Sequence, residues 1–407
     1  VLPFWLNNSI DDVHGGYYTC LDHNGEIYDD TKYSWLQGRQ VYMFSHVYNE
    51  SFENEEIRMK CLIGASCGID FLNKALDTTT GYLFFSTSKD GKSLLHLQRK
   101  PYSAVFYVQG MLEYYRALVK YQTYLTNSNK PSSCTDRMKQ HLENPIQFFQ
   151  QAESMFQHLL EWIEDPSKCG RPKTTNNNSN NGHRTTQLAD VMCAASLALD
   201  FIVVLNEIDV TLLPSTYKKK NYYLNLIETA MKDCLRHYDT RNNRNIFLET
   251  VCGDTITSST PEERLFCPGH SIEVVWFLLQ MCDVVGGSER HEKVALDVLK
   301  GSLIKGWDEK NGYGGLMYMM DIEGKPLVDA TVTADGKLWW PHTEALIALT
   351  MAYTRTKDVE WLKWLEKVHT YSYKTFVTNV TLEGKTNEST NESTDEWFGY
   401  CHRDGSV

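Results

Sequence analysis

One predicted helix entrance carries an imidazole and a carboxylate among large apolar residues. In CPGHSIEVVWFLL (267–279), His270 and Glu273 are three residues apart, so they share one face of a helix. Histidine titrates near neutral pH and suits general acid–base catalysis, and a neighbouring carboxylate would fix its orientation. The spacing predicts a catalytic base held by Glu273. A structural interpretation also stands, in which a neighbour satisfies a buried histidine and the glutamate complements the helix dipole.

A second helix entrance, LWWPHTEALIAL (338–349), repeats the arrangement with His342 and Glu344 after Pro341. Residues two apart point in different directions on a helix, so these two side chains are not expected to share one pocket. We favour Glu344 as the pocket residue.

A third apolar helix, KYSWLQGRQVYMF (32–44), is interrupted by a single arginine. Arg39 lies four residues from Trp35 and therefore on the same side of the helix. We expect this guanidinium to be buried against a carboxylate or against a ligand oxygen. The first case would make Arg39 part of a structural ion pair, and the second would make it a site residue.

Other chemical motifs are weak. GASCG (64–68) matches the G-x-S-x-G pattern of a nucleophile elbow, but it lies within a helical pattern and no strand precedes it. The sequence has no glycine-rich phosphate loop, and we find no His, Cys or carboxylate cluster at metal-ligand spacing. We therefore expect no metal site.

Helices must position these residues, because helical periodicity dominates the chain. The predicted helices are 33–48, 56–76, 102–122, 143–163, 187–206, 222–237, 269–284, 290–304, 341–354 and 358–376.

Short segments with turn residues between alternating runs separate several of these helices. They predict β-hairpins at 14–30, 80–95 and 311–327, with a similar segment at 396–405. A repeated unit of helix pair plus hairpin favours one closed helical array, a single domain over 1–407, with the hairpins at the site end. Two polar stretches, near 174–186 and 379–396, are predicted to be mobile insertions without chemistry.

Composition limits the range of functions. A net charge of −12 argues against nucleic-acid binding, and no run approaches the roughly 18 apolar residues of a membrane span. The 11 cysteines are odd in number, scattered and without a CxxC pair, which indicates reduced thiols and a cytoplasmic protein.

Several motifs together resemble one family. YSWLQGRQVYMF, CPGHSIEVVWFLL, WWPHTEALIAL and EWFGY appear in order, and the likeness extends over nearly the whole chain, weakening in 124–186 and 379–394. The sequence resembles the N-acylglucosamine 2-epimerase family, also called renin-binding protein in mammals.

The resemblance implies an all-α fold, an α/α six-fold barrel with short β-hairpins at the site end. It implies reversible interconversion of N-acetylglucosamine and N-acetylmannosamine, activation by ATP or another nucleotide that is not consumed, and a homodimer. By the same resemblance Arg39, His270 and Glu344 are catalytic. The residues expected to bind substrate are Glu273, Trp35, Trp340 and Tyr107.

Other interpretations stay open. The family carries a second catalytic histidine in a later motif, and this sequence stops at Val407, so we expect a fragment. His402 is out of register with that histidine and receives no role. A catalytically impaired member that binds a renin-like protease would fit, as would a cellobiose 2-epimerase or an aldose–ketose isomerase. A glycoside hydrolase on the same barrel would need paired carboxylates instead.

Overall fold

The computed structural model describes residues 1–22, 24–50, 54–97, 101–127, 134–169, 185–208, 217–253, 255–286, 288–327, 334–377 and 397–407. The insertion predicted at 379–396 lies outside the described residues, and so does most of the one at 174–186. Residues 185 and 186 belong to a strand, so the insertion predicted at 174–186 extended two residues too far.

All ten predicted helices are confirmed, and two short helices were missed. The missed helices are α1 (Leu2–Asn8) and α5 (Asp136–Glu143). The others are α2 (Ser34–Asn49), α3 (Glu55–Lys74), α4 (Tyr102–Asn127), α6 (Ile146–Glu164), α7 (Leu188–Glu207), α8 (Lys220–Arg236), α9 (Pro268–Val285), α10 (Glu289–Gly306), α11 (Trp339–Thr356) and α12 (Val359–Thr375). Short 3-10 turns occupy η1 (Pro166–Cys169), η4 (Arg241–Asn243), η5 (Glu262–Arg264) and η6 (Lys310–Gly312).

Local side chains fix several helix ends. Asn54 accepts a hydrogen bond from the amide of Ile57 at the start of α3, and Thr135 does the same for α5. At the other end of α9, Gly286 takes the left-handed conformation, with a φ of 87°, that ends many helices.

The strands are short and antiparallel. They are β1 (Cys20–Leu21), β2 (Ile27–Asp29), β3 (Lys32–Tyr33), β4 (Phe84–Thr87), β5 (Leu94–Leu97), β6 (Thr185–Gln187), β7 (Tyr238–Asp239), β8 (Ile246–Phe247), β9 (Thr250–Cys252), β10 (Leu265–Phe266), β11 (Met320–Asp321), β12 (Lys337–Leu338) and β13 (Tyr400–Cys401). The sheets are β1-β2, β3-β4-β5, β6-β9, β7-β8, β10-β11 and β12-β13.

Two of the four predicted hairpins are confirmed, at β1-β2 and β4-β5. The prediction for 311–327 was wrong in its return arm, because the amides of Tyr318 and Met319 bond to the carbonyls of Gly336 and Ala334. The segment 396–405 is not a hairpin of two strands, because its strand β13 pairs with β12. Both errors arise because a two-residue strand pairs with whichever edge the packed helices bring near it.

The residue contacts group the chain into two compact units. The first unit comprises residues 1–174 and 200–223, and the second comprises 175–199 and 224–407. The expectation of a single domain over 1–407 stays a prediction.

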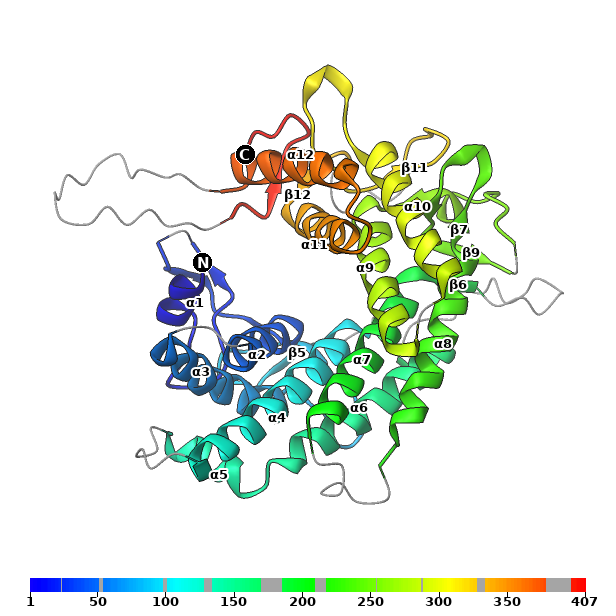
Figure 1. The fold of residues 1–407 in the computed structure, drawn as a ribbon. Helices are drawn as coiled ribbons and strands as arrows, with labels where there is room; N and C mark the ends of the chain where they lie inside the picture. Colours follow the sequence, from blue (N-terminus) through cyan, green and yellow to red (C-terminus); the bar gives the residue numbers. More distant parts are fainter. Residues whose placement is uncertain are drawn as a thin grey trace, which may run out of the picture. The chain divides into compact units, whose positions relative to one another are not determined.

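In the first unit, α2 packs against α3 and α4, and α4 packs against α6 (Figure 1). Gly38 allows the close approach of α2 to α4, because a Cβ there would lie 2.5 Å from the carbonyl oxygen of Phe106. A stack of Phe201 on Tyr223, with ring centroids 4.5 Å apart, forms part of the core of this unit.

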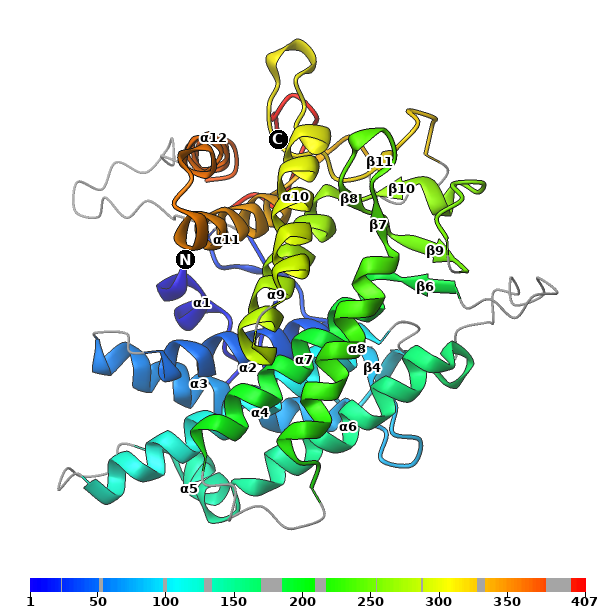
Figure 2. The ribbon, with the colours of Figure 1, turned by 45° about the vertical axis from the view of Figure 1, so that its right-hand side comes forward.

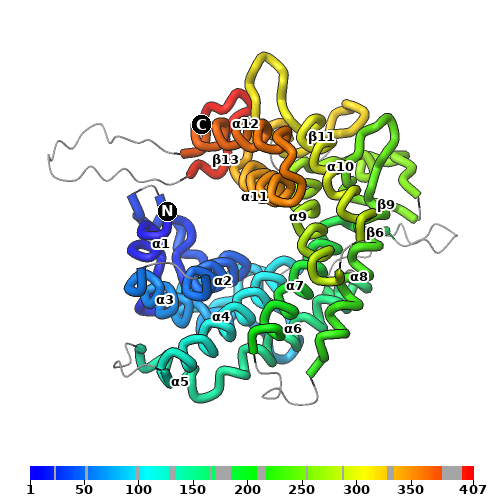
Figure 3. The backbone as a smooth tube through the Cα atoms, in the orientation of Figure 1, coloured from blue at the N-terminus to red at the C-terminus, as the bar shows by residue number. Residues whose placement is uncertain are grey.

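In the second unit, α9 packs against α10 and α11, and α11 packs against α12 (Figure 3). The strands β7 to β11 lie near one another beside these helices (Figure 2). Buried apolar residues of these strands and their links make a small core of their own: Ile246, Leu248, Phe266 and Ile322.

One described helix, α7, is long and apolar enough to cross a membrane, although no run of 18 apolar residues occurs in it. In this structure 72% of its most apolar window is buried inside the protein. A core helix passes the same test of length and composition, so α7 is described here as a core helix.

A strand precedes each of the three helices that carry the predicted catalytic residues, directly or after one residue. β3 ends at Tyr33 and α2 begins at Ser34, while β12 ends at Leu338 and α11 begins at Trp339. β10 is followed by one residue, Cys267, and then by α9. The strands therefore fix where the first turns of α2, α9 and α11 lie.

Candidate active site

The first turn of α9 holds His270 in a closely packed setting. Cys267 is the extended residue before the helix, and Pro268 occupies the first helical position, where its missing N–H costs nothing. Gly269 is required by packing, because a Cβ there would meet the ring of Trp340 at 2.5 Å. The absence of a side chain at 269 thus lets the indole on α11 approach the imidazole on α9.

His270 is held by a carboxylate, but not by the one that its spacing suggested. Its Nδ1 lies 3.0 and 3.1 Å from the two carboxylate oxygens of Glu249. Glu249 follows β8, and its own amide donates to the carbonyl of Leu265 at 3.1 Å. The prediction that Glu273 holds His270 is therefore corrected, because the hydrogen-bonded carboxylate at Nδ1 is that of Glu249.

Aromatic and sulfur groups complete the surroundings of the imidazole. The centroid of the Trp340 ring lies 5.1 Å from that of His270, and Tyr318 meets Trp340 edge-on at 6.4 Å. Burial opposes the charge on His270, but Cys267 and Glu249 outweigh it and raise the pKa of His270 well above its usual value. The ring is thus built to hold a proton, with its side chain still 26% exposed.

The second helix entrance separates its two polar residues, as the sequence suggested. His342 is fully buried, with Nδ1 2.7 Å from the carbonyl of Leu338 and Nε2 accepting from the amide of Leu316 at 2.9 Å. Burial is the main cause that lowers the pKa of His342 to about 3. Glu344 instead accepts a hydrogen bond from the indole of Trp276 at 2.7 Å. His342 is therefore structural, and Glu344 is the partly exposed member of the pair.

Arg39 lies in the first unit and is exposed, so the expectation of a buried arginine was wrong. Its guanidinium carbon lies 4.8 Å from the ring centroid of Phe106 and 6.0 Å from that of Trp35. Both rings are within the range of a cation–π contact with the guanidinium. Arg39 is thus an exposed arginine whose guanidinium lies against aromatic rings.

Tyr107 does not face solvent. It is 1% exposed, and its hydroxyl donates to Asn73 at 3.0 Å. The prediction that Tyr107 binds substrate is therefore corrected, because both its ring and its hydroxyl are used inside the first unit.

One backbone contact recurs in three of the helix entrances. Gln37 accepts a hydrogen bond from the amide of Tyr17 at 2.8 Å, and Ser271 accepts from the amide of Phe247 at 3.0 Å. His342 accepts from the amide of Leu316 in the same way. We call Gln37, Ser271 and His342 the amide-reading residues, because each ties the start of its helix to a turn segment.

The charged residue two places after each amide-reading residue is a predicted site residue. These residues are Arg39, Glu273 and Glu344. A two-residue step turns about 200° around a helix, so each charged side chain leaves its helix on the side away from the turn segment. Equivalent positions in three repeats therefore present one arginine and two carboxylates, while His270 stands one residue before its amide-reading residue.

The sequence missed Glu249, Tyr318, Trp276 and the contribution of Cys267. Glu249 lies 21 residues before His270 and reaches it only through the pairing of short strands, so no spacing rule would have found it. The closeness of Cys267 to His270 could have been predicted, because Cys-x-x-His at a helix start puts both side chains in one turn. The donor atoms of Glu249, Cys267 and His270 all lie within 4.8 Å of one another, contrary to the expectation that no such cluster exists.

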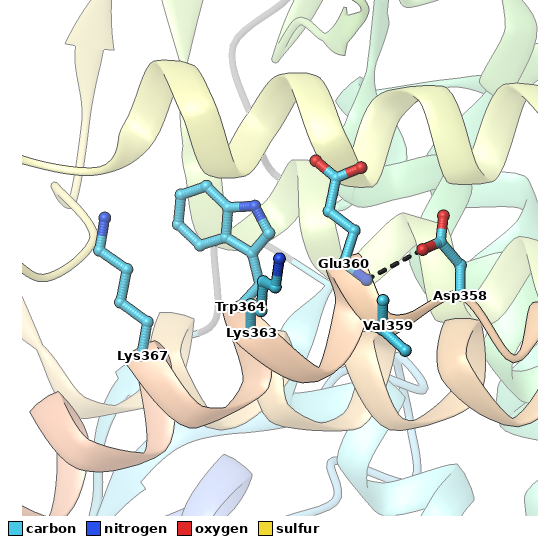
Figure 4. Close-up of a pocket in the computed structure, with 6 residues that line it drawn as sticks. All are labelled: Asp358, Val359, Glu360, Lys363, Trp364 and Lys367. Carbon is cyan, nitrogen blue, oxygen red and sulfur yellow. Dashed lines mark hydrogen bonds between the residues drawn. The ribbon is translucent and has the colours of Figure 1, made fainter.

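Two surface depressions lie away from the candidate site. One follows the start of α12, where Asp358 accepts from the amide of Glu360 at 2.9 Å and Trp364 lies between Lys363 and Lys367 (Figure 4). Another, polar depression is lined in part by Lys310, Asp335, His402 and Arg403. Neither contains a residue of the candidate site.

Comparison with known proteins identifies the family of this chain. The family described as N-acylglucosamine 2-epimerase (GlcNAc 2-epimerase) matches residues 16–154 and 212–399. The N-acylglucosamine 2-epimerase of Mus musculus is 30% identical over 100% of this chain and 83% of its own length. That of Homo sapiens is 29% identical over 100% of this chain and 81% of its own length.

Solved structures show the same fold. A cellobiose 2-epimerase from Bacillus thermoamylovorans B4167 aligns with a TM-score of 0.68 at 16% identity, covering 100% of this chain and 89% of that one. A D-mannose isomerase aligns with a TM-score of 0.64, also at 16% identity, covering 100% and 88%. The predicted fold class, an all-α protein of the α/α barrel type, is confirmed. The chain belongs to the N-acylglucosamine 2-epimerase family, and it is an enzyme of the isomerase class.

Proposed function

We propose that this sugar epimerase interconverts N-acetylglucosamine and N-acetylmannosamine by moving the proton on C2 of the ring-opened sugar. Support for the substrate comes from relatives that carry the name N-acylglucosamine 2-epimerase and match the full length of this chain. Support for the chemistry comes from one observation, the hydrogen bond between Nδ1 of His270 and Glu249.

Inversion at C2 needs an acidic proton, and ring opening supplies one by placing an aldehyde next to C2. Removal of that proton gives an enolate, and return of a proton to the other face gives the epimer. Because Glu249 occupies Nδ1, the other ring nitrogen, Nε2, is left to exchange a proton with the substrate. His270 serves one face of C2, and it removes the proton in one direction of the reaction and returns it in the other.

The charged residues of the three repeated positions have complementary parts in this proposal. Arg39 stabilises the enolate oxygen, which becomes charged only as the proton leaves. Glu273 and Glu344 bind sugar hydroxyls, and the hydrogen bond from Trp276 holds the Glu344 carboxylate in place. Trp340 offers an aromatic surface beside His270, as apolar sugar faces require.

The test follows the C2 hydrogen directly. Each sugar is incubated separately with the protein in D₂O, with and without ATP, and loss of the C2 proton signal is recorded together with product formation. We expect His270→Gln to slow exchange at one face by about 10²–10⁴-fold, the usual contribution of a positioned acid or base. Glu249→Gln, which keeps shape but loses charge, is expected to slow it about 10- to 100-fold by analogy with other groups that orient a functional histidine.

A matched control is His369→Gln, because His369 stacks on Tyr373 in α12 and belongs to no part of the site. Exchange in this variant should equal that of the parent. If His270→Gln retained more than about a tenth of the exchange rate with an unchanged circular dichroism spectrum, the proposed role would be wrong. Release of free reducing ends from a disaccharide would indicate hydrolysis instead.

The Arg39→Lys variant tests whether the guanidinium stabilises the enolate oxygen. An ammonium keeps the charge but lacks the planar fork of the guanidinium, so we expect kcat/KM to fall by about 10²-fold or more for both epimers. A loss below about threefold would mean that Arg39 only supports the fold of α2.

Three further properties belong to the same proposal. We expect a cytoplasmic homodimer that a nucleotide such as ATP activates without being consumed. The odd number and scattered positions of the 11 cysteines support the reducing compartment. A protease of the renin type stays an expected partner, and its binding to the epimerase would be measured by titration.

A further inference from the structure

We propose that Glu249, Cys267 and His270 form a binding site for a thiolate-preferring divalent cation such as Zn²⁺. The three residues come from the link after β8, the residue before α9 and the first turn of α9. Their donor atoms lie within 4.8 Å of one another, and Nδ1 of His270 is 3.0 Å from Glu249. Zinc bonds to nitrogen, oxygen and sulfur at about 2.0–2.3 Å, which places tetrahedral ligands roughly 3.5 Å apart. A closure of at most about 1 Å between donor atoms completes that geometry.

Backbone hydrogen bonds hold Cys267 and Glu249 in place before any cation arrives, and His270 lies in the first turn of α9. The carbonyl of Cys267 accepts from the amide of Ser271 at 3.0 Å as part of α9. The amide of Glu249 donates to Leu265, and its carbonyl accepts from Leu188 at 2.9 Å. Because the backbone is fixed, only side-chain rotation is needed to bring the sulfur toward the imidazole and the carboxylate.

The ligand types select the cation. One sulfur, one imidazole nitrogen and one carboxylate oxygen exclude the hard cations Mg²⁺ and Ca²⁺, which prefer oxygen alone. Three protein ligands leave the fourth position of a tetrahedral ion for water, as in zinc sites that stay open. Cys267 is fully buried, so the cation reaches the site past the side chain of His270, which is 26% exposed.

A second cluster shows what a site already filled by a cation looks like. His46, Glu50 and Glu113 also bring their donor atoms within 4.8 Å of one another. Arg116, however, lies 3.0 Å from both Glu50 and Glu113 and supplies their positive charge. Among the described ion pairs around Glu249, Cys267 and His270, the partner of Glu249 is the imidazole itself.

Binding of the cation exchanges protons. The thiol of Cys267 releases its proton, and the cation replaces the proton between Nδ1 of His270 and Glu249. The imidazole of His270 then carries its single proton on Nε2, so this nitrogen cannot accept a proton from the substrate. In the part of this inference that rests on the proposed function, Zn²⁺ therefore inhibits epimerisation, and a chelator restores it.

Cobalt(II) tests the site without any sugar. Titration of Co²⁺ into the reduced protein is expected to give a near-ultraviolet thiolate-to-cobalt absorption band that saturates at one ion per chain, and Zn²⁺ is expected to remove it. Cys267→Ser should abolish the band, while Glu249→Gln should weaken the affinity about 10- to 100-fold. Cys252→Ser is the matched control, because Cys252 is a half-buried thiol of the same unit and lies outside the cluster.

A measurement on the parent protein tests the site even if Cys267→Ser does not fold. X-ray absorption of the zinc-loaded parent protein should show one sulfur at about 2.3 Å and nitrogen or oxygen ligands at about 2.0–2.2 Å. No band in the parent, a band that persists in a folded Cys267→Ser variant, or a zinc shell without sulfur would overturn the proposal. These readouts do not depend on turnover, so a failure of the epimerase proposal leaves them interpretable.

Discussion

The helix entrances that carry Arg39 and Glu344 are built alike but are not equally secure. In the first unit, Lys32 is fully buried and lies 2.7 Å from Asp11, and it also donates to the carbonyl of Gly15. In the second unit, Lys337 is fully buried and lies 3.1 Å from Asp308, and it donates to the carbonyl of Gly315. Each lysine stands seven residues before the charged site residue.

The difference is in the second cation. Asp308 also receives two hydrogen bonds from Arg403, at 2.8 and 3.0 Å, which arrives with the segment that contains β13. Asp11 has the half-buried His14 at 3.3 Å, while the ammonium of Lys32 rests 4.4 Å from the Phe71 ring centroid. A buried carboxylate needs at least one full positive charge beside it. Loss of the buried lysine should therefore destabilise the protein more at Asp11 than at Asp308.

The largest effect is expected for Lys32→Met. The change leaves Asp11 buried without a permanent cation, so the free energy of unfolding should fall by about 3–5 kcal/mol. Urea unfolding followed by circular dichroism measures the loss. A variant as stable as the parent would show that the buried Asp11 carboxylate does not need the charge of Lys32. The proposed difference between the two helix entrances would then be wrong.

Lys337→Met should cost less, about 1–3 kcal/mol, because Arg403 still neutralises Asp308. The same urea experiment, run beside Lys32→Met, gives the ranking. An equal or larger loss at Lys337 would show that Arg403 is no substitute for the buried lysine.

A double-mutant cycle sharpens the role of Arg403. Arg403→Gln alone should be mild, because Lys337 remains with Asp308. Combined with Lys337→Met it should cost more than the sum of the single changes, by about 1 kcal/mol, since contacting charges are coupled. Strict additivity would mean that the two cations act on Asp308 independently.

Acid should erase the advantage of Lys337. Burial raises the pKa of Asp308, but Arg403 and Lys337 outweigh it and lower that pKa from 3.8 to about 2. A carboxyl with a lowered folded pKa stabilises the protein above its unfolded pKa, and this contribution is lost as pH falls through the folded pKa. The stability difference between the parent and Lys337→Met should therefore narrow from about pH 4 to about pH 2. Lys367→Met, which breaks an ion pair with the exposed Glu309, should show little difference at any pH.

The smallest effect is expected for His342→Gln, below about 1 kcal/mol. Gln37 makes the equivalent contact in the first unit through an amide, so glutamine should accept from the amide of Leu316. His342→Leu is the contrasting variant, because it leaves that amide buried without an acceptor and should cost about 1–3 kcal/mol. Equal losses in the two variants would show that the imidazole packs in a way that the hydrogen bond does not explain.

Much of the helical fold could be predicted from the sequence, because apolar residues recur at helical spacing along long amphipathic helices. The same local information placed His270 and Glu344 at helix entrances and separated Glu344 from His342. Glu249 could not be found in this way, because it reaches His270 through strands of two or three residues.

Burial also depends on neighbours that a single segment does not reveal. Tyr107 was expected at the substrate and lies in the core, while Arg39 was expected to be buried against a carboxylate or a ligand oxygen and is exposed. Both lie on strongly apolar helices, where the sequence does not distinguish the side that meets another helix from the side that meets solvent.

The three amide-reading residues show that one structural task can be met by chemically different side chains. A glutamine, a serine and a histidine each accept a hydrogen bond from the amide of a turn segment at Gln37, Ser271 and His342. The position two residues later takes no part in that hydrogen bond. A helix entrance of this kind can therefore present either sign of charge, as Arg39 and Glu344 do, without changing the contact that holds the start of its helix.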